Sequence, residues 1–155
     1  MILLKFFLCL VLFSWAAPES APVINQVLFY ESKQSWTSRD LELFEKIKKE
    51  VLHKDRIGQF VESNDEDFIL SRLSAREALL FEVSPVKLKM SETQKAAFNG
   101  FSQKEIENEL SEIGLAMSLI DLKESQLKQK LRFKTWLDLL KRKYQVKVKS
   151  PEFKP

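Results

Sequence analysis

The sequence predicts a mainly α domain, a multi-helix orthogonal bundle with a small β-sheet formed by an N-terminal hairpin and a C-terminal strand. Three observations lead to this fold class. Five segments begin with a hydroxyl residue followed three positions later by an acidic or amide residue, and each precedes an apolar run with helical spacing. Glycine is scarce, with 3 in the whole chain. Segments rich in β-favouring residues occur only near the two ends of the predicted domain.

Residues 1–16 have the three parts of an export signal. Lys5 and the amino terminus supply positive charge, an apolar run follows, and Ser14 and Ala16 are small residues before a cleavage site predicted between Ala16 and Ala17. The run is shorter than the ~20 residues that a membrane-spanning helix needs, so we expect a cleaved signal peptide and no stable membrane span. The expected parts of the chain are a signal peptide (1–16), a linker (17–23), a helical domain (24–149) and a disordered tail (150–155).

The sheet is expected to be built from both ends of the domain. Residues 27–30 are apolar and β-favouring, residues 31–34 are interpreted as a turn, and residues 35–37 return as a second strand. After the last helix, residues 145–149 alternate polar and apolar, which is the period of a strand. Since a single strand needs a partner, the two ends are expected to meet in one sheet.

Helix starts are predicted where a hydroxyl side chain can accept a hydrogen bond from an unpaired backbone N–H group. The five candidates are Thr37, Ser63, Ser91, Ser102 and Ser118. A first helix follows Thr37, and a second, near residues 65–83, is expected at the centre of the core with Arg72 and Arg76 on its other side. The residues that the second helix is expected to bury are Phe68, Ile69, Leu73, Leu79, Leu80 and Phe81.

Three further helices complete the expected bundle. Short helices are predicted over residues 92–98 and 103–113, and Gly114 would close the second of them as a left-handed C-cap. The last helix, about residues 119–144, is predicted to be the longest. Its apolar stripe comprises Leu127, Leu131, Leu137, Leu140 and Tyr144, and it is widened by Phe133 and Trp136.

The residue types that support catalysis are few. Removal of the signal peptide would remove Cys9, the only cysteine, so no disulfide or thiolate metal site is expected. His53, the only histidine, is interpreted as a solvated loop residue, because charged residues surround it. The sequence also lacks a glycine-rich phosphate loop, a serine-nucleophile elbow and a His-Glu-x-x-His pair. We therefore expect no catalytic residue, no metal and no cofactor, and the chain is not predicted to be an enzyme.

Charge is nearly balanced overall but unevenly distributed. After cleavage the chain would carry 24 basic and 22 acidic residues, which argues against a nucleic-acid-binding protein. Residues 121–149 hold ten Lys or Arg and three Asp or Glu, a net charge of +7. This basic segment could attract an acidic polymer, anionic lipid head groups or acidic unfolded chains. The alternative is a solvated helix face that keeps the protein soluble.

The order of these segments resembles the N-terminal domain of SurA-type periplasmic chaperones, a helical peptide-binding domain. The segments that carry the resemblance are VINQVLFYESKQSWTSRDLELF, ILSRLSAREALLFEVSPVKLKMSE, FSQKEIENELSEIGLAMSLIDLKESQLKQKLRF and WLDLLKRKYQVKV. The resemblance implies a periplasmic protein that binds unfolded or extended polypeptides, typically outer-membrane protein precursors. In the family this domain is usually joined to parvulin isomerase domains. Only residues 150–155 follow the expected closing strand here, so no isomerase activity is implied.

A peptide-binding protein needs an apolar groove that accepts many sequences, and flexible methionines and aromatics outside the main helical stripes are the candidates. These are Met90, Phe98, Phe101 and Met117. The alternative is that they fill gaps between short helices. At the level of function, the alternative is an exported adaptor or structural subunit that docks on one specific envelope partner. Secretion beyond the cell is the second choice of destination after the periplasm.

Overall fold

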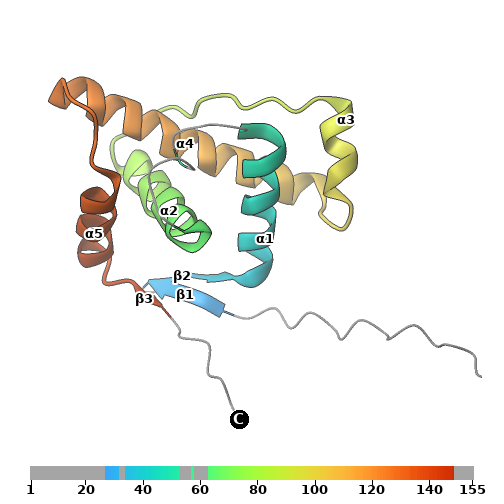
Figure 1. The fold of residues 1–155 in the computed structure, drawn as a ribbon, viewed down its shortest axis with the longest axis horizontal. Helices are drawn as coiled ribbons and strands as arrows, with labels where there is room; N and C mark the ends of the chain where they lie inside the picture. The colour runs from blue at the N-terminus through green and yellow to red at the C-terminus, as the bar shows by residue number, and fades with distance from the viewer. Residues whose placement is uncertain (1–26, 32–33, 53–56, 58–62, 149–155) are drawn as a thin grey trace, which may run out of the picture.

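The computed structural model describes residues 27–31, 34–52, 57 and 63–148, and it is mainly α with its helices packed on one another (Figure 1). This is the predicted fold class. The elements in chain order are β1 (Val27–Glu31), β2 (Gln34–Thr37), α1 (Ser38–Ile47), the π-helical segment η1 (Lys48–Leu52), α2 (Asn64–Leu80), α3 (Glu92–Lys95), the 3-10 turn η3 (Ala96–Phe98), α4 (Gln103–Leu127), α5 (Phe133–Lys143) and β3 (Lys147–Val148).

The sheet joins the two ends of the described chain, as predicted. It is antiparallel with the strand order β2-β1-β3, so the N-terminal strand lies in the middle. Phe29 of β1 is opposite Trp36 of β2 and opposite Val148 of β3. The closing strand begins at Lys147 and not at the predicted residue 145, because Gln145 has a positive φ of 50° and belongs to the turn after α5; the predicted end at residue 149 lies outside the described residues.

The central helix of the bundle is α2, which packs mainly against α4 and also contacts α5 and α1 (Figure 1). Between residues 67 and 78 every residue of α2 except Arg76 is buried. An aromatic cluster connects this helix to the sheet. The ring of Phe29 stacks on that of Trp36 with 4.5 Å between centroids, and it meets the edge of Phe68 at 5.5 Å. Phe44 of α1 lies 5.4 Å from the same Phe68 ring.

Four of the five predicted helix starts are confirmed. The side chains of Thr37, Ser63, Ser91 and Ser102 each accept a hydrogen bond from the backbone N–H three residues later. At all of them except Ser63, the side chain three residues later also accepts a hydrogen bond from the backbone N–H of the cap, which completes a capping box. These starts depend on contacts within four residues, which explains why sequence spacing alone locates them.

Two predictions about the middle of α4 are wrong, because this helix is continuous from residue 103 to residue 127. Gly114 is not a C-cap, and Ser118 does not begin a helix. A Cβ at Gly114 would overlap the carbonyl oxygen of Val86, so this glycine permits the close approach of the segment after α2. The Val86 N–H donates to the Gly114 carbonyl at 3.1 Å and to Ser118 Oγ at 2.9 Å. Both small residues therefore serve a contact between distant segments.

The helix ends also differ from the predictions. After α2 the Val83 N–H donates to the Ala78 carbonyl at 3.0 Å, and after α5 the Val146 N–H donates to the Lys141 carbonyl at 3.1 Å. These are Schellman-type closures, which place one residue in the left-handed conformation that glycine usually occupies. Here non-glycine residues occupy it at the ends of α2, α4 and α5, namely Glu82, Lys128 and Gln145.

As a result α2 ends at Leu80 and not near residue 83. The prediction that Leu79, Leu80 and Phe81 are buried is wrong, since each is more than half exposed. Arg72, predicted to lie on the other side of α2 from the core, is only 4% exposed, because it forms ion pairs with two glutamates of α4.

The single long helix predicted over residues 119–144 is two helices in the structure. α4 ends at Leu127, Lys128 turns the chain with a φ of 52°, and α5 begins at Phe133. The break separates the predicted apolar stripe into two parts. Leu131, Leu137, Leu140 and Tyr144 are buried as predicted together with Phe133, whereas Leu127 is exposed.

Within the described ranges, no helix is both long enough and apolar enough to cross a membrane. The expected signal peptide, its cleavage site at Ala16 and Ala17, the linker and the tail after residue 149 all lie outside the described residues. They stay predictions from the sequence.

Candidate functional site

The four residues that the sequence singles out for peptide binding do not form an exposed surface. Phe98 is only 2% exposed and belongs to the core, while Met90, Phe101 and Met117 are partly buried and pack against it. Phe101 is also covered by a cation, the Arg39 guanidinium at 4.7 Å from its ring centroid. These placements favour the alternative interpretation, in which the four side chains fill gaps between helices.

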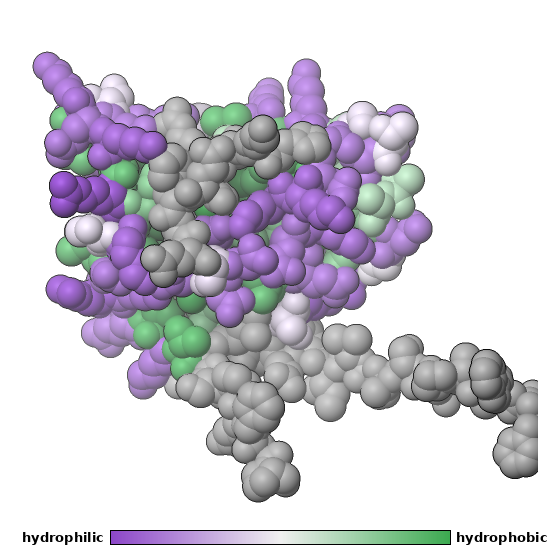
Figure 2. Space-filling view, viewed as in Figure 1, coloured by the Kyte–Doolittle hydropathy of each residue, from purple (hydrophilic) through white to green (hydrophobic). Residues whose placement is uncertain are grey.

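Five of the seven exposed large apolar side chains of the described residues lie at the end of α2 or on α4 and α5 near their junction. Leu127 and Leu139 are each 53% exposed, and Leu79, Leu80 and Phe81 are also more than half exposed. On the face drawn in Figure 2, hydrophilic side chains predominate and hydrophobic ones form smaller patches between them. Exposed leucines that adjoin a hollow are the exception on such a surface, and they mark a candidate binding site.

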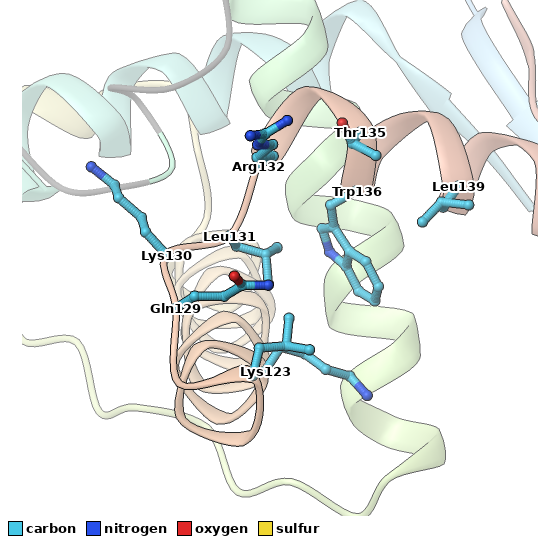
Figure 3. Close-up of a pocket in the computed structure, with 9 residues that line it drawn as sticks. Lys123, Gln129, Lys130, Leu131, Arg132, Thr135, Trp136 and Leu139 are labelled. Carbon is cyan, nitrogen blue, oxygen red and sulfur yellow. The ribbon is translucent and has the colours of Figure 1, made fainter.

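The hollow is a pocket of about 430 Å³ between the end of α4 and α5 (Figure 3). We call it the corner pocket. Residues of α4, of the connector 128–132 and of α5 line it: Lys123, Leu127, Gln129, Lys130, Leu131, Arg132, Thr135, Trp136 and Leu139. None of the four sequence candidates is among them.

The connector between α4 and α5 shapes one wall of this pocket. The backbone N–H of Leu131 donates to Glu124 Oε1 of α4 at 3.2 Å, which folds the connector back onto the helix that it leaves. The Leu131 side chain is buried and lines the pocket. Arg132 then precedes α5, and its carbonyl accepts the N–H of Trp136 at 2.9 Å in the first turn. These contacts fix how the connector leaves α4 and where α5 begins.

Trp136 lies between the corner pocket and the central helix. Figure 3 shows its ring extending from α5 into the space in front of α2, with Lys123 and Leu131 on one side and Leu139 on the other. Its indole N–H donates to Ser74 Oγ of α2 at 3.3 Å. Because the polar edge of the ring is engaged, the part that lines the pocket is apolar.

The pocket continues toward the exposed end of α2. The Lys123 ammonium, which lines the pocket, lies 4.3 Å from the centroid of the Phe81 ring. Ser74 and Phe81 are two helical turns apart, so they face the same side of α2, toward α4 and α5. We use the name corner surface for the pocket together with Phe81.

The basic segment predicted near the C-terminus divides into two parts. One part pairs with carboxylates of α2: Lys134 and Lys141 bind Glu66, and Lys143 binds Glu77. These contacts hold α5 against the central helix, and the hydrogen bond from Lys134 lowers the pKa of Glu66. Tyr144 donates to the same Glu77. Burial, with that hydrogen bond, raises the pKa of Tyr144 to about 12, so its hydroxyl stays a donor at neutral pH.

The other part of the basic segment lines the corner pocket. Lys123, Lys130 and Arg132 are among its lining residues, and no acidic residue is. The pocket therefore combines an apolar interior with a positively charged rim, which suits a ligand that has both an apolar group and negative charge.

The described residues contain no group of three or more His, Cys, Asp or Glu side chains that could hold a metal ion. His53, the only imidazole, lies outside them. The corner surface offers apolar contacts, cations and one indole, which are groups for binding.

Sequence reasoning missed this site because it treated residues 119–144 as one helix with one inner stripe. A weak signal was present: Leu139 is apolar but lies off the spacing of Leu137, Leu140 and Tyr144, three residues after Trp136 at the edge of that stripe. A second apolar edge on the last helix could have indicated a second surface.

Comparison with known proteins returns no match, since no protein-family model, no curated protein and no solved structure matches this chain. The resemblance to SurA-type chaperones accordingly rests on the order of the sequence segments alone and stays a prediction.

Proposed function

We propose that this chain is an exported, chaperone-like protein that binds unfolded or extended polypeptides on the corner surface. The observation that carries the proposal is the exposed apolar group of Leu127, Leu139 and Phe81 around an open pocket. Fully burying one such side chain contributes about 1.5–3 kcal/mol. Several of them together can offset the entropy that a flexible polypeptide loses on binding, without requiring one specific sequence.

The proposed location is the periplasm, and the proposed clients are precursors of outer-membrane proteins. The support for both comes from the sequence: the signal-like residues 1–16 and the SurA-type order of segments. The corner surface supports the proposed clients, because its exposed leucines offer apolar contacts to an unfolded chain.

The test is suppression of aggregation. The wild-type protein at near-stoichiometric ratio should reduce the light scattering of several unrelated unfolded proteins during refolding. Leu139→Asp should lose most of this effect, because it places a charge in the apolar wall of the pocket. Since Leu139 is half exposed, the free energy of unfolding should change by less than about 0.5 kcal/mol.

The matched control is Ala97→Asp, which adds the same side chain at an exposed position in η3, at the other end of the molecule from α5 (Figure 1). It should suppress aggregation like the wild type. If the wild type suppresses nothing and captures a single envelope protein instead, the adaptor alternative is correct and the proposal is wrong.

A further inference from the structure

We propose that the corner pocket selects polypeptide segments in which a bulky apolar side chain is flanked by acidic residues. This inference rests on the proposed function and names the class of segment that would bind. It concerns the pocket itself, where an apolar interior and a basic rim occur together.

The interior can hold one large apolar side chain. Its volume of about 430 Å³ lies within the range of about 300–1,000 Å³ that is usual for ligand pockets. Leu131 is buried beneath it, and Leu139 and Trp136 provide apolar walls. Since the Trp136 N–H already donates to Ser74, the indole needs no polar group from the ligand. A side chain without hydrogen-bonding groups therefore leaves nothing unsatisfied on entering.

The rim attracts negative charge. Lys123 of α4 and the connector residues Lys130 and Arg132 supply three cationic side chains among the nine that line the pocket, and none of the nine is acidic. A carboxylate beside the entering apolar side chain would lie near these cations.

Part of the basic segment is engaged elsewhere. Lys134, Lys141 and Lys143 form ion pairs with Glu66 and Glu77 of α2. The three cations that line the pocket are therefore a separate group from the lysines that hold α5 against α2. A local rim of cations around an apolar hollow favours an acidic peptide over a long polyanion, which would need a continuous basic track.

The experiment measures binding of labelled peptides to the full chain by fluorescence anisotropy. The first peptide carries a central Phe between Glu residues, the second has Lys in place of each Glu, and the third has Ser in place of the Phe. The first should bind at least about tenfold more tightly than either of the others. Because exposed charges are screened by ions, its affinity should fall as sodium chloride is added.

Charge-reversal variants locate the site. Lys123→Glu alone and the double variant Lys123→Glu with Arg132→Glu should weaken binding of the acidic peptide by about fivefold and more than tenfold, respectively. Both should improve binding of the basic peptide. Lys104→Glu is the matched control, because Lys104 is exposed on the first turn of the same helix and away from the pocket; its affinities should equal those of the wild type.

The outcomes separate this inference from the proposed function. If the acidic and basic peptides bind equally well, the selectivity is wrong while polypeptide binding stands. If no peptide binds and aggregation is not suppressed, both proposals are wrong. The last measurement uses vesicles that contain anionic lipids. Binding to them that depends on Lys123 and Arg132, without binding of any peptide, would show that the corner recognises a lipid surface instead.

Discussion

Helix α4 meets the rest of the bundle in two different ways along its length. In its first half Glu109 and Glu112 pair with Arg72 of α2, and Glu109 and Arg72 are both buried. At its other end Lys123 lies over the exposed Phe81 beside an open pocket. In the α2–α4 interface the charges are compensated within the chain and enclosed. At the corner surface three cations line an open pocket beside exposed leucines, and no acidic residue is among the pocket-lining residues.

The α2–α4 interface is sensitive to substitution because it holds charged side chains in an apolar setting. Within the described part of the chain, Arg72 Nε and Glu109 Oε1 are buried without a hydrogen-bond partner. Such groups are costly unless their ion pairs persist. The exposed region has no equivalent cost, since water solvates its cations. Changes in the interface should therefore alter stability, whereas changes at the corner should alter binding.

The largest effect is expected from Arg72→Met. It leaves Glu109 buried without its ion-pair partner, so the free energy of unfolding should fall by about 3–5 kcal/mol. Urea unfolding followed by circular dichroism measures the change. Arg76→Met is the matched control in the same helix: Arg76 lies 4.8 Å over the Tyr144 ring and is half-buried, so the loss should be below about 1 kcal/mol.

A double variant gives an independent check on the cause. Replacing Arg72 by Met and Glu109 by Leu removes both buried charges, so it should be more stable than Arg72→Met alone. Equal or lower stability of the double variant would mean that the single change acts through lost packing and not through an uncompensated carboxylate.

A smaller effect is expected from pH. Burial raises the pKa of Glu109 from 4.5 to about 7, although Arg72 opposes the shift. The folded protein therefore binds this proton more tightly than the unfolded chain does. The contribution of this proton to the free energy of unfolding is largest below about pH 4.5. It decreases as the pH rises toward about 7, by about 2–3 kcal/mol at most.

The variant Glu109→Gln isolates this contribution. Urea unfolding of both proteins from pH 4.5 to pH 7 measures the effect. As the pH rises over this window, the wild type should lose stability relative to Glu109→Gln. A difference that is constant over this window would contradict the prediction.

The exposed Glu105 contributes to stability with the opposite pH dependence. The hydrogen bond from Arg39 lowers its pKa to about 2, so its contribution is lost only in stronger acid.

The smallest effect is expected at the corner itself. Lys128 ends α4 in the left-handed conformation, which is strained for any residue with a Cβ. Lys128→Gly should raise the free energy of unfolding by about 0.5–1 kcal/mol, because glycine adopts this conformation without strain. Lys130→Gly is the control in the same connector, where φ is not positive, and it should give no gain. Peptide affinity should be unchanged in Lys128→Gly, since Lys128 does not line the pocket.

The two regions also differ in how far the sequence predicts them. The core positions of α2 follow from periodicity, and Phe68, Ile69 and Leu73 are buried as expected. The corner surface depends on where α4 stops and how α5 turns, and no glycine or proline in residues 119–144 indicates a break. The candidates chosen for flexibility, Met90, Phe98, Phe101 and Met117, are buried or partly buried, because residue type alone does not determine which apolar side chains are left uncovered.

The sequence by itself determined where four helices begin and that the two ends of the domain meet in one sheet. Helix starts need only a hydroxyl and a backbone N–H three residues apart, and strands follow from alternation. Tertiary structure alone decided where α2, α4 and α5 end. No glycine occupies the left-handed positions at these ends, so packing sets where the helices stop. Val83 and Val146, which follow the left-handed residues after α2 and α5, pack against the core. The same packing leaves Leu127 and Leu139 exposed around the corner pocket, because it turns the last predicted helix into two.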